Sequence, residues 1–181
     1  MTQLWEITSG GINGFANLTS KNHEDLLGGL FNTDGKPKVW DKVPSVEPTF
    51  YKGKKPQPPM ADFGWFAPGT VILNEKALAA LQTFLSGFGE FLEMNCLGAP
   101  RYFYNVTNLI SCINFDQSEK IEAAIIRPVF LQEAIPLKAQ IFKDPLTAGG
   151  HIYATQAARE VLEAIILQYG LTGLRFHEAG K

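Results

Sequence analysis

The feature that most constrains the fold is a strand–helix–strand pattern that occurs twice, 81 residues apart. In the first copy, a short strand at 69–73 precedes Asn74, a good helix N-cap, and apolar residues then recur at helical spacing. In the second copy, a strand at 150–154 precedes Thr155, and an apolar stripe runs from Ala158 to Ile166. Each predicted helix has one apolar face, which has to be buried against a sheet.

The two copies also match beyond their caps. Leu81 falls on Leu162, and Gly89 falls on Gly170. We expect Gly87 or Gly89 to end the first helix in a left-handed cap, and Gly170 to end the second. Strands are predicted to follow at 91–94 and 174–176. The match fits two related units from a duplication, and it also fits independent use of common capping residues.

Further strands are predicted between and before these units. β-forming residues occur at 4–8, 101–106 and 138–142, and also at 124–131, where Pro128 indicates an edge or a bulge. We therefore expect an α+β fold, with a mixed or mainly antiparallel sheet and two capped helices packed on it. The 181 residues fit a single domain, 1–181.

The N-terminal third has a different composition from the rest. The stretch 10–60 is rich in Gly, Pro, Asn and Lys, and it includes the run Lys-Pro-Gln-Pro-Pro at 55–59. Because proline removes backbone donors, this pattern predicts a long Pro/Gly-rich loop region. We expect a loop-rich portion at 1–68 and an α+β core at 69–178.

Charge and hydropathy exclude two classes of partner. The chain has 16 Lys plus Arg against 18 Asp plus Glu, a net charge of −2, whereas a general nucleic-acid binder usually carries a strong basic excess. No apolar run is long enough for a transmembrane helix, so no membrane partner is expected. The first residues lack the pattern of a secretory signal, and we expect a cytoplasmic protein.

Residues 35–60 nevertheless hold six lysines and a net charge of +4. This group is either a solvated loop or a patch for an acidic partner that includes Tyr51, Lys52, Lys54 and Lys55.

Motifs of catalysis are missing from the sequence. There is no nucleophile elbow, phosphate-binding loop or zinc pattern, and we expect neither a cofactor nor a metal. Cys96 and Cys112 have apolar neighbours and are expected to be buried free thiols.

Two groups of side chains are candidates for binding. The first is aromatic: Trp40, and Phe63, Trp65 and Phe66 beside Asp62, either core anchors or interface residues. The second consists of Asp116, Glu119 and Glu122, whose spacing would place them on one side of a helical turn. These carboxylates are either a solvated face or the rim of an interface.

The residues 102–119, YFYNVTNLISCINFDQSE, resemble the central motif of a bacterial immunity-protein family. It is the eleventh family in the numbered immunity series of polymorphic toxin systems, formerly a domain of unknown function. Residues 71–78 and 89–92 resemble its middle pattern, and 152–176 resembles its ending. The likeness covers about 25–178. Thr107 and residues 153–155 depart from the family at structural positions.

The resemblance implies a protein that binds and neutralises a cognate toxin domain by steric blocking, in the cytoplasm and without catalysis. The binding candidates above would then contact the toxin. A second hypothesis is a small enzyme or ligand-binding domain that uses the Asp116, Glu119 and His151 region. Formation of a homo-oligomer, including self-association through the proline-rich region, is left open.

Overall fold

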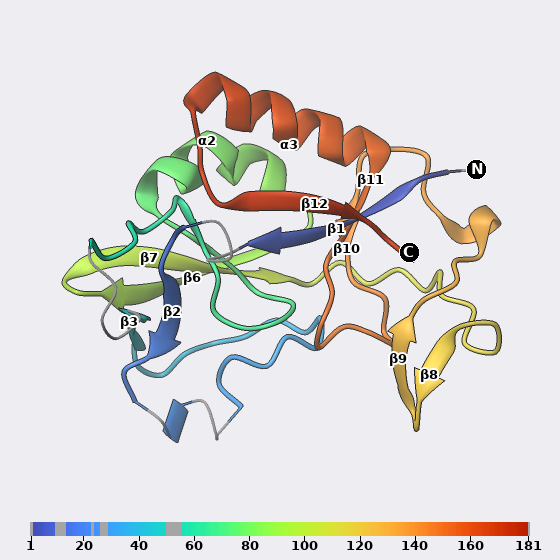
Figure 1. Ribbon diagram of the computed structural model, residues 1–181, viewed down its shortest axis with the longest axis horizontal. Coiled ribbons are helices and arrows are strands. Elements are labelled where there is room, and N and C mark those ends of the chain that lie inside the picture. The colour runs from blue at the N-terminus through green and yellow to red at the C-terminus, as the bar shows by residue number, and fades with distance from the viewer. Residues whose placement is uncertain (1, 10–13, 23, 26–28, 50–55, 181) are drawn as a thin grey trace.

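The computed structural model describes residues 2–9, 14–22, 24–25, 29–49 and 56–180, and the predicted α+β class is confirmed. Two sheets and a separate hairpin are visible in Figure 1, with helices α2 and α3 side by side. The two longer helices among the described residues are α2 (Glu75–Leu85) and α3 (Gln156–Tyr169), and η2 (Gln132–Ala134) is one turn of 3₁₀ helix.

Sheet A has four antiparallel strands in the order β10-β11-β1-β12. Its strands are β1 (Leu4–Ser9), β10 (Ile141–Phe142), β11 (Tyr153–Thr155) and β12 (Leu174–Glu178).

Sheet B has six strands in the order β2-β3-β6-β7-β5-β4, antiparallel except for the parallel pair β3–β6. Its strands are β2 (Asn17–Ser20), β3 (Ser45–Thr49), β4 (Phe63–Gly64), β5 (Val71–Leu73), β6 (Gly89–Cys96) and β7 (Ala99–Val106). The remaining strands, β8 (Glu119–Ile121) and β9 (Ala124–Arg127), form a two-stranded sheet of their own.

The two strand–helix–strand units share one geometry. In the first, β5 and β6 both run antiparallel to β7, which lies between them; in the second, β11 and β12 both run antiparallel to β1. The central strand follows its unit directly in the first case and is the first strand of the chain in the second. In strand order, the second unit with its central strand is therefore a circular permutation of the first. That the two units arose by duplication stays a prediction.

Both predicted N-caps are confirmed. The Asn74 side chain accepts a hydrogen bond from the Ala77 N–H at 2.8 Å, and Thr155 accepts one from the Ala158 N–H at 3.3 Å. The left-handed cap at Gly170 is also confirmed, with φ 56°.

The predicted glycine cap of the first helix is wrong. Helix α2 ends at Ser86 in a right-handed conformation, and the Ser86 hydroxyl donates to the Gln82 carbonyl at 2.6 Å. Gly89 has another role, since a Cβ there would lie 2.3 Å from the Asn105 carbonyl oxygen of the neighbouring strand.

The N-terminal portion is more ordered than the predicted loop region. Strands β2, β3 and β4 lie within 1–68 and belong to sheet B, so that sheet contains strands from both sides of residue 68. The sheet curls until its ends meet: the Leu18 N–H of β2 donates to the Trp65 carbonyl at 2.7 Å, just beyond β4. Gly64 permits this approach, because a Cβ would lie 2.6 Å from the Leu18 side chain.

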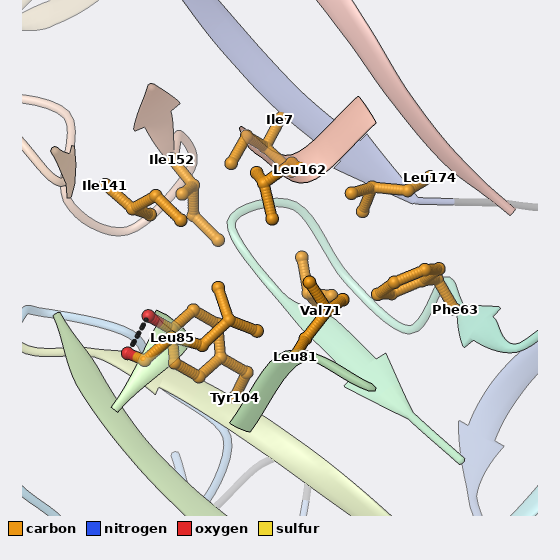
Figure 2. Close-up of a pocket in the computed structure, with 10 residues that line it drawn as sticks. All are labelled: Ile7, Phe63, Val71, Leu81, Leu85, Tyr104, Ile141, Ile152, Leu162 and Leu174. Atoms are coloured by element: carbon orange, nitrogen blue, oxygen red, sulfur yellow. Dashed lines mark hydrogen bonds between the residues drawn. The ribbon is translucent and has the colours of Figure 1, made fainter. Parts of the chain in front are cut away.

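The described residues form three apolar clusters in the interior. The largest lies between α2, α3 and the two sheets, the second lines the other face of sheet B, and the third lies beneath the β8–β9 hairpin. The first cluster contains a cavity of about 20 Å³, lined by side chains from both sheets and both helices. Figure 2 shows these side chains. The Tyr104 hydroxyl at the edge of the cavity donates to the Leu85 carbonyl at 2.8 Å.

Candidate functional site

Two of the aromatic candidates are interior. Phe63 is 1 % exposed between the two sheets, and Phe66 is 6 % exposed with its ring centroid 4.6 Å from that of Phe31. Trp40 is partly buried in the same cluster as Phe66, and Trp65 is half-buried. Phe63 and Phe66 are thus core anchors and offer no surface to a partner.

Asp62 joins the two strand–helix–strand units. Its carboxylate accepts hydrogen bonds from the Asn74 side chain at 2.8 Å and from the Thr172 N–H and hydroxyl at 2.8 and 2.9 Å. Burial raises the pKa of Asp62, but these hydrogen bonds outweigh burial and bring the pKa below its ordinary value. Asp62 is occupied in holding the fold together.

Four residues of the proposed basic patch, Tyr51, Lys52, Lys54 and Lys55, lie outside the described residues. Of the other lysines in this region, Lys36 is exposed and pairs with Asp34 at 3.4 Å. Such an exposed pair contributes little stability.

The three carboxylates do not share a helical turn, so that prediction is wrong. Asp116 lies in a turn, Glu119 is in β8, and Glu122 is in the tight turn between β8 and β9 with φ 55°. The alternating residues on both sides of this turn pair as strands, which overrides the helical spacing. Glu119 pairs with Arg127 across the hairpin at 2.8 Å.

The hairpin has one buried and one exposed face. Ile125 is 9 % exposed and packs into the apolar cluster beneath the hairpin. Ile126 follows it, and Ile121 pairs with Ala124, so both isoleucines lie on the opposite face, where they are 48 % and 63 % exposed. Phe115 and Val129, at 43 % and 37 % exposure, lie on the segments that lead into and out of the hairpin. We call Ile121 and Ile126 the hairpin patch.

The hairpin projects from the body but is firmly rooted. Figure 1 shows β8 and β9 apart from the two larger sheets. Its backbone pairing continues inward, with the Asn114 N–H donating to the Val129 carbonyl at 2.8 Å and the Leu131 N–H to the Cys112 carbonyl at 2.7 Å. The hairpin is thus held at its base by backbone hydrogen bonds, and it presents apolar side chains on its exposed face.

A buried carboxylate anchors the base of the hairpin. Asp144 is 1 % exposed and accepts hydrogen bonds from the N–H groups of Cys112, Ile113 and Leu146 at 2.7, 2.8 and 2.9 Å. Burial and the nearby Asp144 raise the pKa of Cys112 to about 12. Both cysteines are buried and free, as predicted.

The preceding residue, Lys143, connects three other segments. Its side chain is fully buried and donates to the carbonyls of Thr33, Gly69 and Ala148 at 3.1, 3.1 and 2.6 Å. Burial lowers the pKa of Lys143 to about 7, and the charge of Asp34 acts in the opposite direction. Lys143 and Asp144 together fix the N-terminal segment and the hairpin to the same point of the core.

The sequence analysis missed the isoleucines, Lys143 and Asp144. The signal for the first was present, because residues 120–126 place apolar residues on both sides of a tight turn and would give a hairpin with two apolar faces. Lys143 and Asp144 had a weaker signal in the sequence, which was their position directly after a short apolar strand.

The residues of the enzyme hypothesis are not brought together. Asp116 and Glu119 belong to the hairpin and are exposed, whereas His151 Nδ1 lies 2.9 Å from Glu6 on β1. No group of three or more His, Cys, Asp or Glu side chains within the described residues could hold a metal ion. In the same part of the chain, no helix is long and apolar enough to cross a bilayer.

Comparison with known proteins does not assign the chain to a family. No protein-family model matches the chain, and no match is found among curated proteins. The resemblance to an immunity family therefore stays a prediction.

Proposed function

We propose that this protein is a cytoplasmic immunity protein that binds a toxin domain and neutralises it by steric blocking, without catalysis. The observation that carries the proposal is the hairpin patch. Two isoleucines lie exposed on one face of an arm whose base is held by buried hydrogen bonds. A few well-packed side chains in the centre of an interface supply most of its binding energy, and a rigid arm loses little entropy on binding.

A projecting hairpin is better suited to steric blocking of a partner than to catalysis. A projecting hairpin can enter the cleft of another protein and exclude its substrate, with no reacting group required of the hairpin itself. The resemblance of residues 102–119, which lead directly into β8, supports the same function.

Co-expression tests this proposal. The tagged protein is produced with the product of the adjacent upstream gene, and complex formation and growth of the producing cells are measured. We expect a stoichiometric complex with nanomolar affinity, and survival of cells that otherwise die. A folded protein that neither binds nor protects would refute the proposal.

A further inference from the structure

We infer that Arg101 is the centre of a binding site for a small oxyanion, phosphate or a carboxylate, on the face of sheet B that carries the second apolar cluster. The inference goes beyond the proposed function and does not depend on it. It rests on the guanidinium of Arg101, which is buried and, among the described residues, has one hydrogen-bond partner and no ion-pair partner.

Arg101 lies on β7, close to the place where the two ends of sheet B meet. It stands opposite Met94 on β6, and Phe103 is on the same face of β7; both neighbours are buried in the second apolar cluster. The Arg101 Nη1 atom donates to the Ala61 carbonyl at 2.9 Å. A Cβ at Gly64 would lie 3.9 Å from Nη1, so the guanidinium is next to β4.

The guanidinium has more donors than the surrounding protein satisfies. It carries five N–H groups, and the Ala61 carbonyl is the one acceptor that the described residues offer to it. The residue is 6 % exposed, so water reaches only a small part of the side chain. The planar, fixed arrangement of these donors matches the paired oxygens of a carboxylate or a phosphate.

The positive charge of Arg101 also lacks a partner. No described residue forms an ion pair with it, and the residues outside the described ranges include neither Asp nor Glu. The charge of Asp62 acts on Arg101, but the Asp62 carboxylate already accepts hydrogen bonds from Asn74 and Thr172. Burial lowers the pKa of Arg101, yet an arginine keeps its charge at neutral pH.

The neighbouring thiol does not supply the missing negative charge. Burial raises the pKa of Cys96, so this cysteine is protonated near neutral pH. A neutral donor would be enough to hold the Ala61 carbonyl, whereas a buried charge without a counter-charge is costly. An oxyanion would supply both the counter-charge and the acceptors, and it would join β7 to the segment that leads into β4.

Urea unfolding in the presence of added anions tests the inference. Inorganic phosphate and acetate are each compared with chloride at equal ionic strength and pH 7. A ligand that binds only the folded protein, at ten times its dissociation constant, lowers the unfolding equilibrium constant about tenfold. We expect a saturable effect of this size from phosphate, from acetate or from both, and none from chloride. Which of the two anions acts identifies the oxyanion.

Two matched variants assign the effect to Arg101. Arg101→Met removes the buried charge and should abolish the response to both anions. Arg175→Met removes an exposed arginine on β12 and should respond as the wild-type protein does. If Arg101→Met does not fold, the Nε–Hε resonances of the wild-type protein decide: that of Arg101 should shift saturably with the anion, and that of Arg175 should not.

Three results would overturn the inference. An equal response of the wild-type protein and Arg101→Met would indicate a general salt effect. A wild-type protein that responds to neither anion more than to chloride would show that the guanidinium binds no oxyanion, and so would an Arg101 resonance that does not move. None of these results affects the proposed function, which complex formation with the toxin tests separately.

Discussion

The two strand–helix–strand units and the β8–β9 hairpin differ in how far they bury their apolar side chains. The units bury their apolar residues on both sides of each helix–sheet contact, and Leu81 and Leu162 at matching positions are 0 % and 1 % exposed. The hairpin buries Ile125 but leaves Ile121 and Ile126 in solvent. The units are stabilised by apolar packing, whereas the hairpin is held at its base by a buried charged residue. The difference indicates which region maintains the fold and which can meet a partner.

The largest effect is expected at the base of the hairpin. Asp144→Ala leaves two buried N–H groups and one partly buried N–H group without their acceptor, and we expect the free energy of unfolding to fall by about 3–5 kcal/mol. Urea unfolding gives the value, and amide exchange at Cys112 and Ile113 should accelerate. Asp116→Ala, on an exposed carboxylate nearby, is the control and should change stability by less than about 0.5 kcal/mol. Equal effects would show that the base is not anchored by Asp144.

The next prediction compares the two regions directly. Leu81→Ala removes a buried side chain at the edge of an existing cavity, and we expect a loss of about 3 kcal/mol. Ile121→Ala removes a side chain that is 63 % exposed and should cost less than about 1 kcal/mol. A large loss for Ile121→Ala in urea unfolding would mean that the patch belongs to the core.

Lys143 predicts a dependence of stability on pH. Its pKa is about 7 in the folded protein and 10.5 ordinarily, so above pH 7 the unfolded chain keeps a proton that the folded protein releases. The free energy of unfolding should therefore rise with pH, by about 1 kcal/mol per unit between pH 7 and about 8.5. The raised pKa of Cys112 opposes this rise only near and above 9.0, the ordinary value of a thiol.

The Lys143→Met variant isolates this contribution. It has no proton to release, so its stability should change less over the same range than that of the wild-type protein. Parallel pH profiles of the two proteins in urea unfolding would show that Lys143 does not titrate there.

Smaller losses than at the base of the hairpin or at Leu81 are expected at the helix caps. Asn74→Ala and Thr155→Ala each remove a side-chain cap and should each destabilise the protein by about 1–2 kcal/mol. Asn74 also donates to Asp62, and Thr155 also accepts from the Gln140 N–H at 3.0 Å. Similar losses would support equivalent roles of the two units, and a loss at only one of them would break the equivalence.

The sequence predicted the regular units far better than the rest. Caps at Asn74 and Thr155, the stop at Gly170 and the apolar helix faces follow from local rules, and the structure has them all. Strands β2, β3 and β4 were missed because they are short and β3 contains Pro48, so their pairing depends on distant partners. The role of Asp144 at the base of the hairpin was not predicted for the same reason, because the N–H groups that it binds there are about 30 residues away in the sequence.

The most direct test of the account is the affinity of the partner for two matched variants. In the first, Ile121→Ser and Ile126→Ser are combined on the hairpin; in the second, Leu167→Ser changes a residue that is 85 % exposed on α3. The account predicts that the hairpin variant stays folded and loses at least about 30-fold in affinity, roughly 2 kcal/mol, while Leu167→Ser binds within about twofold of wild type. An unchanged affinity of a folded hairpin variant would contradict the central claim that this hairpin is the binding surface.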